Sequence, residues 1–232
     1  MFELNYYLKT TRLVFIYGAS GVGKTTISKY VSKMTGVNCN NFETDLIREI
    51  VRGYSFSLRS KLLTSNIKST DFNALENYSI LCSSTKDLTI DELKIQSRML
   101  IMPLIFLCEK LKSSNKSAII EGVNIPICDI FSSSDLYLNF KDALFVNLYS
   151  SDPKMHLARL NKRSAYRNSV PLSNKEFEKI RIINDFYFEY SKNYIGQRNL
   201  PFKIISLDTT PTFIENYDAI FELQAQKIFE EL

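Results

Sequence analysis

The octapeptide GASGVGKT at residues 18–25 constrains this chain more than any other feature, and it directly follows the apolar run LVFIY at 13–17. It matches the Walker A pattern G-x-x-x-x-G-K-[ST]. A loop of this kind wraps a polyphosphate with its backbone N–H groups pointing inward, which requires glycine where a Cβ would collide. The chain has only 7 glycines, and three of them lie here. The sequence therefore predicts a phosphate-binding loop rather than a flexible turn before a surface helix.

The residues of this loop have expected tasks. Lys24 should reach the β- and γ-phosphates of ATP and act in catalysis, and Thr25 should hold Mg²⁺. The helix that begins at Lys24 should present its positive end to the phosphates. The predicted cofactors are therefore ATP and Mg²⁺. The predicted ATP-binding residues are Gly18, Ala19, Ser20, Gly21, Val22, Gly23, Lys24, Thr25 and Thr26.

Length and composition favour one globular domain over residues 1–232, with 45% hydrophobic and 23% charged residues. The net charge of +4 favours anionic ligands but falls short of the dense basic surface of a nucleic-acid platform. The most apolar run, 99–108, has about half the length that a membrane span needs. No targeting signal is evident, and the four cysteines include no CxxC pair. We expect a cytoplasmic protein with no membrane partner, as a monomer or homodimer.

Short apolar runs alternate with helix-like segments, which is the pattern of a parallel sheet covered by helices. Strands are expected at 13–17, 118–121, 143–149 and 203–207, with a weaker candidate at 37–42. Helices are expected at 24–35, 46–52, 91–111, 174–194 and 213–230, and one starts at Pro153. Residues 54–89, rich in Ser, Asn and Thr, are a candidate acceptor-binding helical segment.

The absence of other motifs argues against two classes of nucleotide enzyme. A GTPase should carry DxxG and NKxD, and a transport ATPase should carry an LSGGQ-like sequence; the chain has none of these. What remains is phosphoryl transfer to a small acceptor, or an unusual ATPase. Transfer to a hydroxyl requires ATP with Mg²⁺, a carboxylate that orients the acceptor, and cations that neutralise the transferred charge.

The carboxylate candidate is Asp45 in FETDLIREIVRG, at the expected end of the second strand, where ligands bind in doubly wound folds. Arg48 and Arg52 follow on the same helix face, so all three suit an acceptor that carries its own phosphate or carboxylate. The alternative is that Asp45 only caps the helix and pairs with Arg48 in solvent. We assign Asp45 to catalysis and acceptor binding, and both arginines to acceptor binding.

Glu121 ends the apolar run SAIIEG. An acidic residue at the tip of a buried strand beside a phosphate loop commonly has one of two roles. It reaches Mg²⁺ through water, or it contacts a polar group of the acceptor. The alternative is an ordinary strand-end carboxylate. We assign Glu121 to the metal and the acceptor, and its neighbours Gly122 and Asn124 to the acceptor.

The segment HLARLNKRSAYR supplies cations. Arg159, Arg163 and Arg167 are spaced by four residues and form one stripe on a continuous helix, with Lys162 beside it. Such a stripe suits a lid over residues 151–170 that excludes water, although a solvated charged face has the same spacing. We assign Arg159 and Arg163 to catalysis and Arg167 to the acceptor, and we expect His156 to pack or hydrogen-bond rather than catalyse.

Three separated motifs, GASGVGKTT, TDLIREIVR and AIIEGVNIP, resemble those of the 2-phosphoglycerate kinase family. HLARLNKRS followed by FEKIRIINDF resembles the downstream lid and helix of that family, and the patches run in the same order from about residue 13 to residue 206. The resemblance implies a P-loop kinase fold, ATP with Mg²⁺, and phosphorylation of a small metabolite similar to a hydroxy acid.

The fold predicted from these observations is a three-layer α/β P-loop NTPase with a parallel core sheet and a helical lid. Analogy with nucleoside and shikimate kinases gives the strand order 2-3-1-4-5. The predicted function is transfer of the γ-phosphoryl group of ATP to a hydroxyl of a small anionic metabolite, similar to 2-phosphoglycerate. The alternatives are a kinase acting on a sugar, a nucleotide-sugar or an RNA end, and an ATP-dependent switch that transfers no phosphate.

Overall fold

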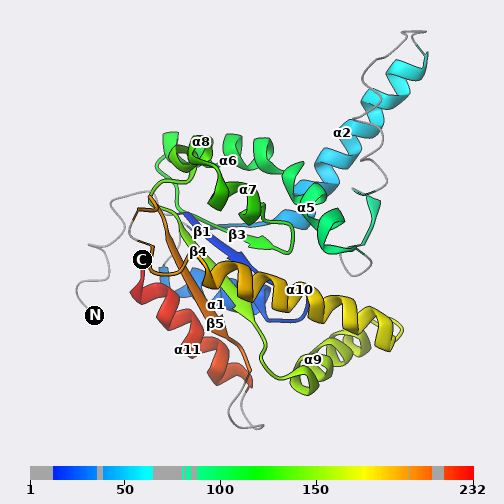
Figure 1. The fold of residues 1–232 in the computed structure, drawn as a ribbon, viewed down its shortest axis with the longest axis vertical. Helices are drawn as coiled ribbons and strands as arrows, with labels where there is room; N and C mark the ends of the chain where they lie inside the picture. The colour runs from blue at the N-terminus through cyan, green and yellow to red at the C-terminus, as the bar shows by residue number, and fades with distance from the viewer. Residues whose placement is uncertain are drawn as a thin grey trace.

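The computed structural model describes residues 13–35, 39–64, 80, 82–84, 88–197, 199–210 and 217–232 (Figure 1). Its centre is a five-stranded parallel sheet in the order β2-β3-β1-β4-β5, which confirms the predicted order and the α/β fold class. The strands are β1 (Leu13–Tyr17), β2 (Asn40–Glu43), β3 (Ala118–Gly122), β4 (Leu144–Tyr149) and β5 (Lys203–Asp208). Because every strand runs the same way, all their carboxyl ends meet at one edge of the sheet.

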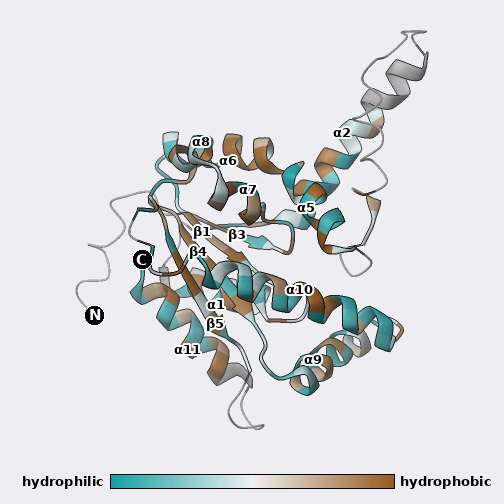
Figure 2. Cartoon of the chain, viewed as in Figure 1, coloured by the Kyte–Doolittle hydropathy of each residue, from teal (hydrophilic) through white to brown (hydrophobic). Residues whose placement is uncertain are grey.

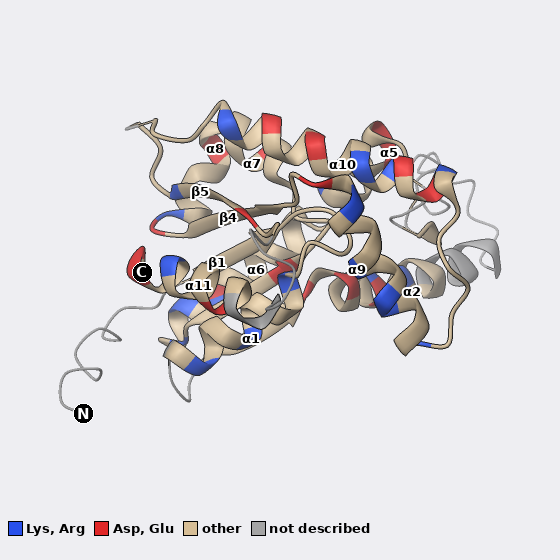
Figure 3. Cartoon of the chain, turned by 90° about the horizontal axis from the view of Figure 1, so that it is seen from below, with Lys and Arg blue, Asp and Glu red and all other residues tan. Residues whose placement is uncertain are grey.

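Helices cover both faces of the sheet. They are α1 (Lys24–Thr35), α2 (Thr44–Thr64), α5 (Ile90–Arg98), α6 (Ile101–Ser113), α7 (Ile127–Ser132), α8 (Ser134–Tyr137), α9 (Pro153–Tyr166), α10 (Asn174–Lys192) and α11 (Tyr217–Glu230), with the 3-10 turn η1 (Leu138–Phe140). In the turned view of Figure 3, α7, α8 and α10 lie on one side of the strands, and α1 and α11 pack together on the other. These are the three predicted layers.

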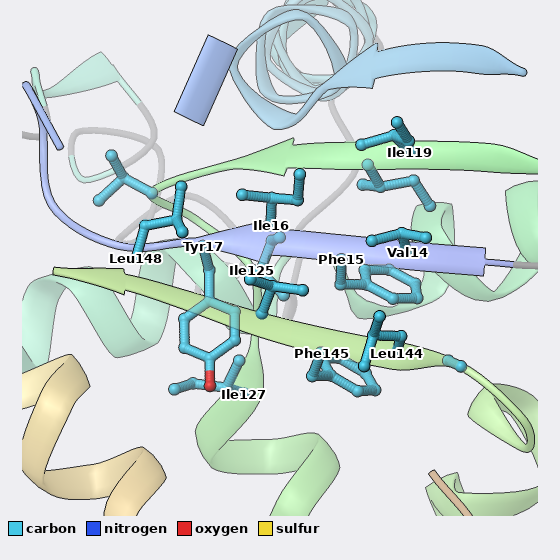
Figure 4. Close-up of a cluster of buried hydrophobic side chains, with 14 of the residues drawn as sticks. Val14, Phe15, Ile16, Tyr17, Ile119, Ile125, Ile127, Leu144, Phe145 and Leu148 are labelled. Atoms are coloured by element: carbon cyan, nitrogen blue, oxygen red, sulfur yellow. The ribbon is translucent and has the colours of Figure 1, made fainter. Parts of the chain in front are cut away.

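The central strand β1 is buried along its whole length because both its edges and both its faces are covered. Phe15 stacks on Phe145 of the neighbouring strand with ring centroids 4.7 Å apart. Figure 4 shows this cluster of apolar side chains, many of them carried by β1, β3 and β4, and Figure 2 shows the hydrophobic colouring of the central strands. The exposed, polar edge strand β2 has the sequence NNFE, and its position at 40–43 lies later than the predicted 37–42.

Two predicted helix boundaries are wrong. The helix predicted to end at Gly53 continues to Thr64 and projects from the body of the molecule (Figure 1). The helix predicted over 91–111 is two helices, because α5 ends at Arg98 and α6 starts at Ile101. Pro103 explains this break: its ring and its missing N–H are tolerated in the first turn of a helix but not in a helix interior. Residues 65–79, 81 and 85–87 of the candidate acceptor segment, and 213–216 of the last helix, lie outside the described residues.

Gly122→Ala is expected to lower the free energy of unfolding by ~1–3 kcal/mol or more. An added Cβ would lie 1.6 Å from Oγ1 of Thr44, which is fully buried. The matched control is Gly53→Ala, where nothing lies within 4 Å of the added atom. That change should stabilise α2 by ~0.5–1 kcal/mol, because alanine has the higher helix propensity. Urea unfolding measures both, and a wild-type free energy for Gly122→Ala would contradict the close packing of β3 against Thr44.

Candidate active site

The loop between β1 and α1 has the backbone of a phosphate-binding loop. Gly18, Gly21 and Gly23 have φ values of 145°, 83° and 95°, in the region that favours glycine. Ser20, Gly21, Gly23, Lys24, Thr25 and Thr26 line a pocket of about 540 Å³ at the carboxyl edge of the sheet. Gly18, Ala19 and Val22 are buried and do not line this pocket. The loop therefore presents one side to the pocket and packs its other side into the core.

Lys24 folds back onto its own loop. Its Nζ donates hydrogen bonds to the carbonyl oxygens of Gly18 at 3.0 Å and Ala19 at 2.8 Å. Burial lowers the pKa of Lys24 to about 8, while the nearby carboxylates of Glu121 and Asp45 act in the opposite direction. Lys24 lines the pocket, and its amine loses its positive charge at mildly alkaline pH.

We expect ATP affinity to fall as pH rises through about 8, because the Lys24 ammonium loses its proton there. At pH 9 only ~10% of free molecules keep that charge, so affinity should be ~10-fold lower than at pH 7. Calorimetric titration with a non-hydrolysable ATP analogue should also show proton uptake on binding at pH 8.5. In the control Lys24→Arg the guanidinium stays charged, so its affinity should be flat over this range. A flat wild-type profile would contradict the lowered pKa.

Glu121 is the buried carboxylate of the site. It accepts hydrogen bonds from the Thr25 hydroxyl at 3.1 Å and the Ser28 hydroxyl at 3.2 Å. Burial raises the pKa of Glu121, and Lys24 and the two hydroxyl donors oppose this shift. The structure thus brings the two predicted metal residues, Thr25 and Glu121, together. Ser28 was missed by sequence reasoning, although it lies one helical turn after Thr25.

Glu43 is a second carboxylate that sequence reasoning missed. It pairs with Glu121 in the register of β2 and β3, and both line the pocket with Asp45. The signal was its position at the end of the second strand, just before Thr44 and Asp45. Oxygen donors of this kind suit Mg²⁺. Within the described residues no three His, Cys, Asp or Glu side chains form a metal-holding cluster, so these donors fit an ion held largely by phosphate and water.

Asp45 lies in the first turn of α2, exposed and facing the pocket. Its Oδ1 is 3.6 Å from Nη2 of Arg48 and 3.5 Å from Nδ2 of Asn124, which donates to it. Asn124 is fully buried, and its own Oδ1 has no hydrogen-bond partner among the described residues. Asp45 is therefore oriented by two neighbours, and both of these were predicted as acceptor residues.

The two arginines of α2 have different surroundings. Arg48 is mostly buried and also contacts Glu49 and Gln96, at 3.6 Å and 3.4 Å. Arg52 forms an ion pair with Glu49. Neither arginine lines the pocket, and neither does Asn124, whereas Gly122 does. Binding of the acceptor by these three residues stays a prediction. Their observed contacts include Asp45, Glu49, Gln96 and the carbonyl oxygen of Ser83.

Helix α9 forms the opposite wall of the pocket. Asp152 caps its start by accepting from the N–H groups of Lys154 and Met155, and Pro153 takes the first helical position. The later turns line the pocket with Arg159, Lys162, Arg163, Tyr166 and Arg167. The predicted cationic stripe therefore faces the phosphate loop rather than only solvent.

The arginines of the stripe have different neighbours. Arg159 donates hydrogen bonds to the hydroxyl and the carbonyl oxygen of Thr209, and its guanidinium lies 5.5 Å from the centre of the Phe221 ring. The charged neighbours of Arg163 are Arg167 and the carboxylates of Asp45, Glu121 and Glu43. Arg163 thus lies near the three carboxylates of the pocket, one of which is Asp45, the predicted acceptor-binding residue. Direct action of either arginine on the transferred phosphoryl stays a prediction.

A glycine-rich loop between β1 and α1, on a sheet of order β2-β3-β1-β4-β5, defines a P-loop nucleotide-binding protein of the kinase-like class. No protein-family model matches the chain. The chain is similar to the mevalonate-3-phosphate 5-kinase of Thermoplasma acidophilum, with 26% identity over 161 residues that cover 68% of this chain and 72% of that protein.

Two solved structures align with nearly the whole chain. A shikimate kinase from Acinetobacter baumannii in complex with shikimate has 14% identity and a TM-score of 0.47, over 98% of this chain and 96% of that one. A protein from Chloroflexus aurantiacus has 15% identity and a TM-score of 0.48, over 97% of this chain and 100% of that one. Both scores are below 0.5. The described helices include none long and apolar enough to span a membrane.

Proposed function

We propose that this protein is an ATP- and Mg²⁺-dependent kinase that phosphorylates a hydroxyl group of a small, phosphorylated hydroxy acid. The observation that carries the proposal is a single pocket in which the phosphate loop, the carboxylate of Asp45 and the cations of α9 face one another. Phosphoryl transfer needs these three elements together, because catalysis rests on positioning and on stabilisation of charge.

Each group has a task that follows from its chemistry. The loop N–H groups and Lys24 bind the β- and γ-phosphates of ATP. Asp45 accepts a hydrogen bond from the acceptor hydroxyl, orients its oxygen toward the γ-phosphorus, and takes its proton as the new P–O bond forms and the bond to ADP breaks. Arg163 and Lys162 stabilise the negative charge on the transferred group. Arg159 is a third cation for this charge.

The oxygen donors of Thr25, Glu121 and Glu43 are the residues that would hold Mg²⁺, Thr25 directly and the carboxylates through water. When bound, Mg²⁺ neutralises phosphate charge and favours departure of ADP. Glu121 already accepts from Thr25 in the structure, which orients the hydroxyl for this task. The buried carboxylate of Glu121 and the oxygens of the exposed residues Thr25 and Glu43, at the end of a phosphate loop, fit a hard cation.

Two sequence likenesses support an acceptor that carries its own charge. The sequence resembles 2-phosphoglycerate kinases, and it is similar to a kinase of mevalonate 3-phosphate. Both named substrates are hydroxy carboxylic acids that already carry one phosphate. The pocket lining adds Lys162, Arg163 and Arg167 to the lysine of the phosphate loop, which suits an acceptor with two anionic groups.

ADP release by the purified protein with ATP and Mg²⁺ tests the proposal. The acceptors to compare are 2-phosphoglycerate and mevalonate 3-phosphate, their unphosphorylated forms glycerate and mevalonate, and a panel of sugars, nucleosides and RNA ends. Stimulation by a phosphorylated hydroxy acid, but not by its unphosphorylated form, is the expected result. Stimulation by a sugar or an RNA end would reject the acceptor class. Tight ATP binding without any stimulated turnover would favour an ATP-dependent switch.

A further inference from the structure

The first turn of α9 lies directly against the phosphate loop. His156 is fully buried, and its Nε2 lies 2.7 Å from the carbonyl oxygen of Ser20. A Cβ on Gly21 would lie 2.6 Å from Cδ2 of Leu160 and 3.2 Å from Nε2 of His156. The loop and the helix are therefore packed together at this point. Ser20 and Gly21 line the pocket, whereas His156 and Leu160 do not.

The neighbours of His156 fix its tautomer. Nη1 of Arg181 lies 3.3 Å from Nδ1, and a guanidinium can only donate, so Nδ1 must accept. The proton is then on Nε2, which donates to the Ser20 carbonyl. Burial lowers the pKa of His156 to about 4, the Ser20 bond opposes this, and Arg181, Arg159 and Lys24 add to it. The ring is therefore a neutral donor at neutral pH.

The group that orients His156 is itself anchored. Arg181 of α10 donates to the carbonyl oxygen of Ser150 at 2.6 Å and forms an ion pair with Asp185 at 3.0 Å. The histidine ring also packs edge-on against Phe177, with centroids 5.9 Å apart. A continuous chain of contacts thus joins α10, the first turn of α9 and the phosphate loop.

The direction of the Ser20 carbonyl also sets the direction of the Gly21 N–H group, because both belong to one peptide unit. In a trans peptide the C=O and the following N–H point in opposite directions. A hydrogen bond that holds the Ser20 carbonyl toward His156 therefore turns the Gly21 N–H away from α9. In a phosphate loop the N–H groups must converge on the ligand. The bond to His156 consequently favours a single orientation of this glycine-containing peptide.

We propose that His156 is a positioning residue that holds the phosphate loop in its ATP-binding shape through the Ser20 carbonyl. The inference rests on the proposed function only in that the loop binds ATP; it needs no particular acceptor. Without the bond a smaller fraction of molecules has the binding shape, and apparent affinity falls in proportion to that fraction. Loss of one such buried hydrogen bond should weaken binding by ~10- to 100-fold.

The test uses three variants of the full chain and binding of a non-hydrolysable ATP analogue and of tripolyphosphate, measured by calorimetry. His156→Phe keeps an aromatic ring but has no N–H, so both ligands should bind ~10-fold or more weakly. His156→Gln offers an amide N–H of similar reach and should recover a large part of that loss. Phe177→Leu is the matched control: it removes packing beneath the ring without changing the donor, so it should lower the Tm while affinity stays within ~2-fold.

Each outcome decides one question. Wild-type affinity in His156→Phe would overturn the inference, and so would an equal loss of affinity in Phe177→Leu, which would reduce His156 to a packing residue. Weakened binding in His156→Phe, with recovery in His156→Gln, supports it. If the wild type binds neither ligand, the proposed function fails together with the inference. If it binds ATP but phosphorylates no hydroxy acid, only the acceptor assignment fails.

Discussion

Lys24→Met should reduce kcat/KM for ATP by ~10³-fold, because the change removes the one cation that the phosphate loop itself contributes. The methionine side chain has similar length and volume, so the loop should keep its packing against the core. The hydrogen bonds of Nζ to Gly18 and Ala19 are part-buried and would be lost, which should lower the Tm only slightly. Steady-state kinetics and direct binding of the ATP analogue measure the effect.

Lys29→Met is the matched control for this change. Lys29 lies in the same helix but is exposed and does not line the pocket. Its removal alters net charge equally, so its kinetics should stay within ~2-fold of wild type. Similar losses in both variants would show that overall charge, and not the position of Lys24, supports ATP binding.

Asp45→Asn should lower kcat by ~10²–10⁴-fold and leave ATP affinity within ~2-fold, because the amide keeps the shape but cannot accept the proton of the acceptor hydroxyl. The effect should appear in kcat more than in KM. Single-turnover kinetics with a stimulating acceptor, together with binding of the ATP analogue, separate the two steps.

Glu49→Gln is the control for Asp45. Glu49 is on the same helix and lies at the same 3.6 Å distance from Arg48, but it does not line the pocket. If Asp45 only supplies a charge partner for Arg48, both variants should lose activity alike. A nearly normal turnover in Asp45→Asn would reject its catalytic role, and a cellular function that needs Lys24 but not Asp45 would favour the ATP-dependent switch.

The sheet could be predicted because its central strands are fully buried and read as apolar runs, and because the phosphate loop fixes where the first strand ends. β2 was placed less well, since an exposed edge strand with the sequence NNFE has no apolar pattern. Gly53 predicts a helix end, yet one exposed glycine costs a helix only ~1 kcal/mol, and the other 20 residues of α2 offset this cost.

The positions of Lys24 and Thr25 at the pocket could be predicted, because the Walker A pattern places both residues at the start of the helix. Their tasks stay predictions. Asp45 and Arg163 lie 118 positions apart in the sequence, yet they are close in the fold. This closeness depends on the strand order, which was predicted by analogy with known kinases. Ser28 and Glu43 were missed although their positions gave a signal, because their contacts with Glu121 appear only in the fold. The contact between His156 and Ser20 had no sequence signal, because only the fold brings the two residues close.

The position of Lys24 has a consequence for ligand selection. Two of the three N–H bonds of its ammonium group are already directed at backbone carbonyls of Gly18 and Ala19. An incoming anion must therefore compete with these two carbonyl oxygens for the hydrogen-bond donors of the Lys24 ammonium group. Chloride or a single sulfate offers little net gain in that exchange, whereas a triphosphate brings several charged oxygens to the same place. These two hydrogen bonds of Lys24 thus favour polyphosphates over the common small anions of the cell.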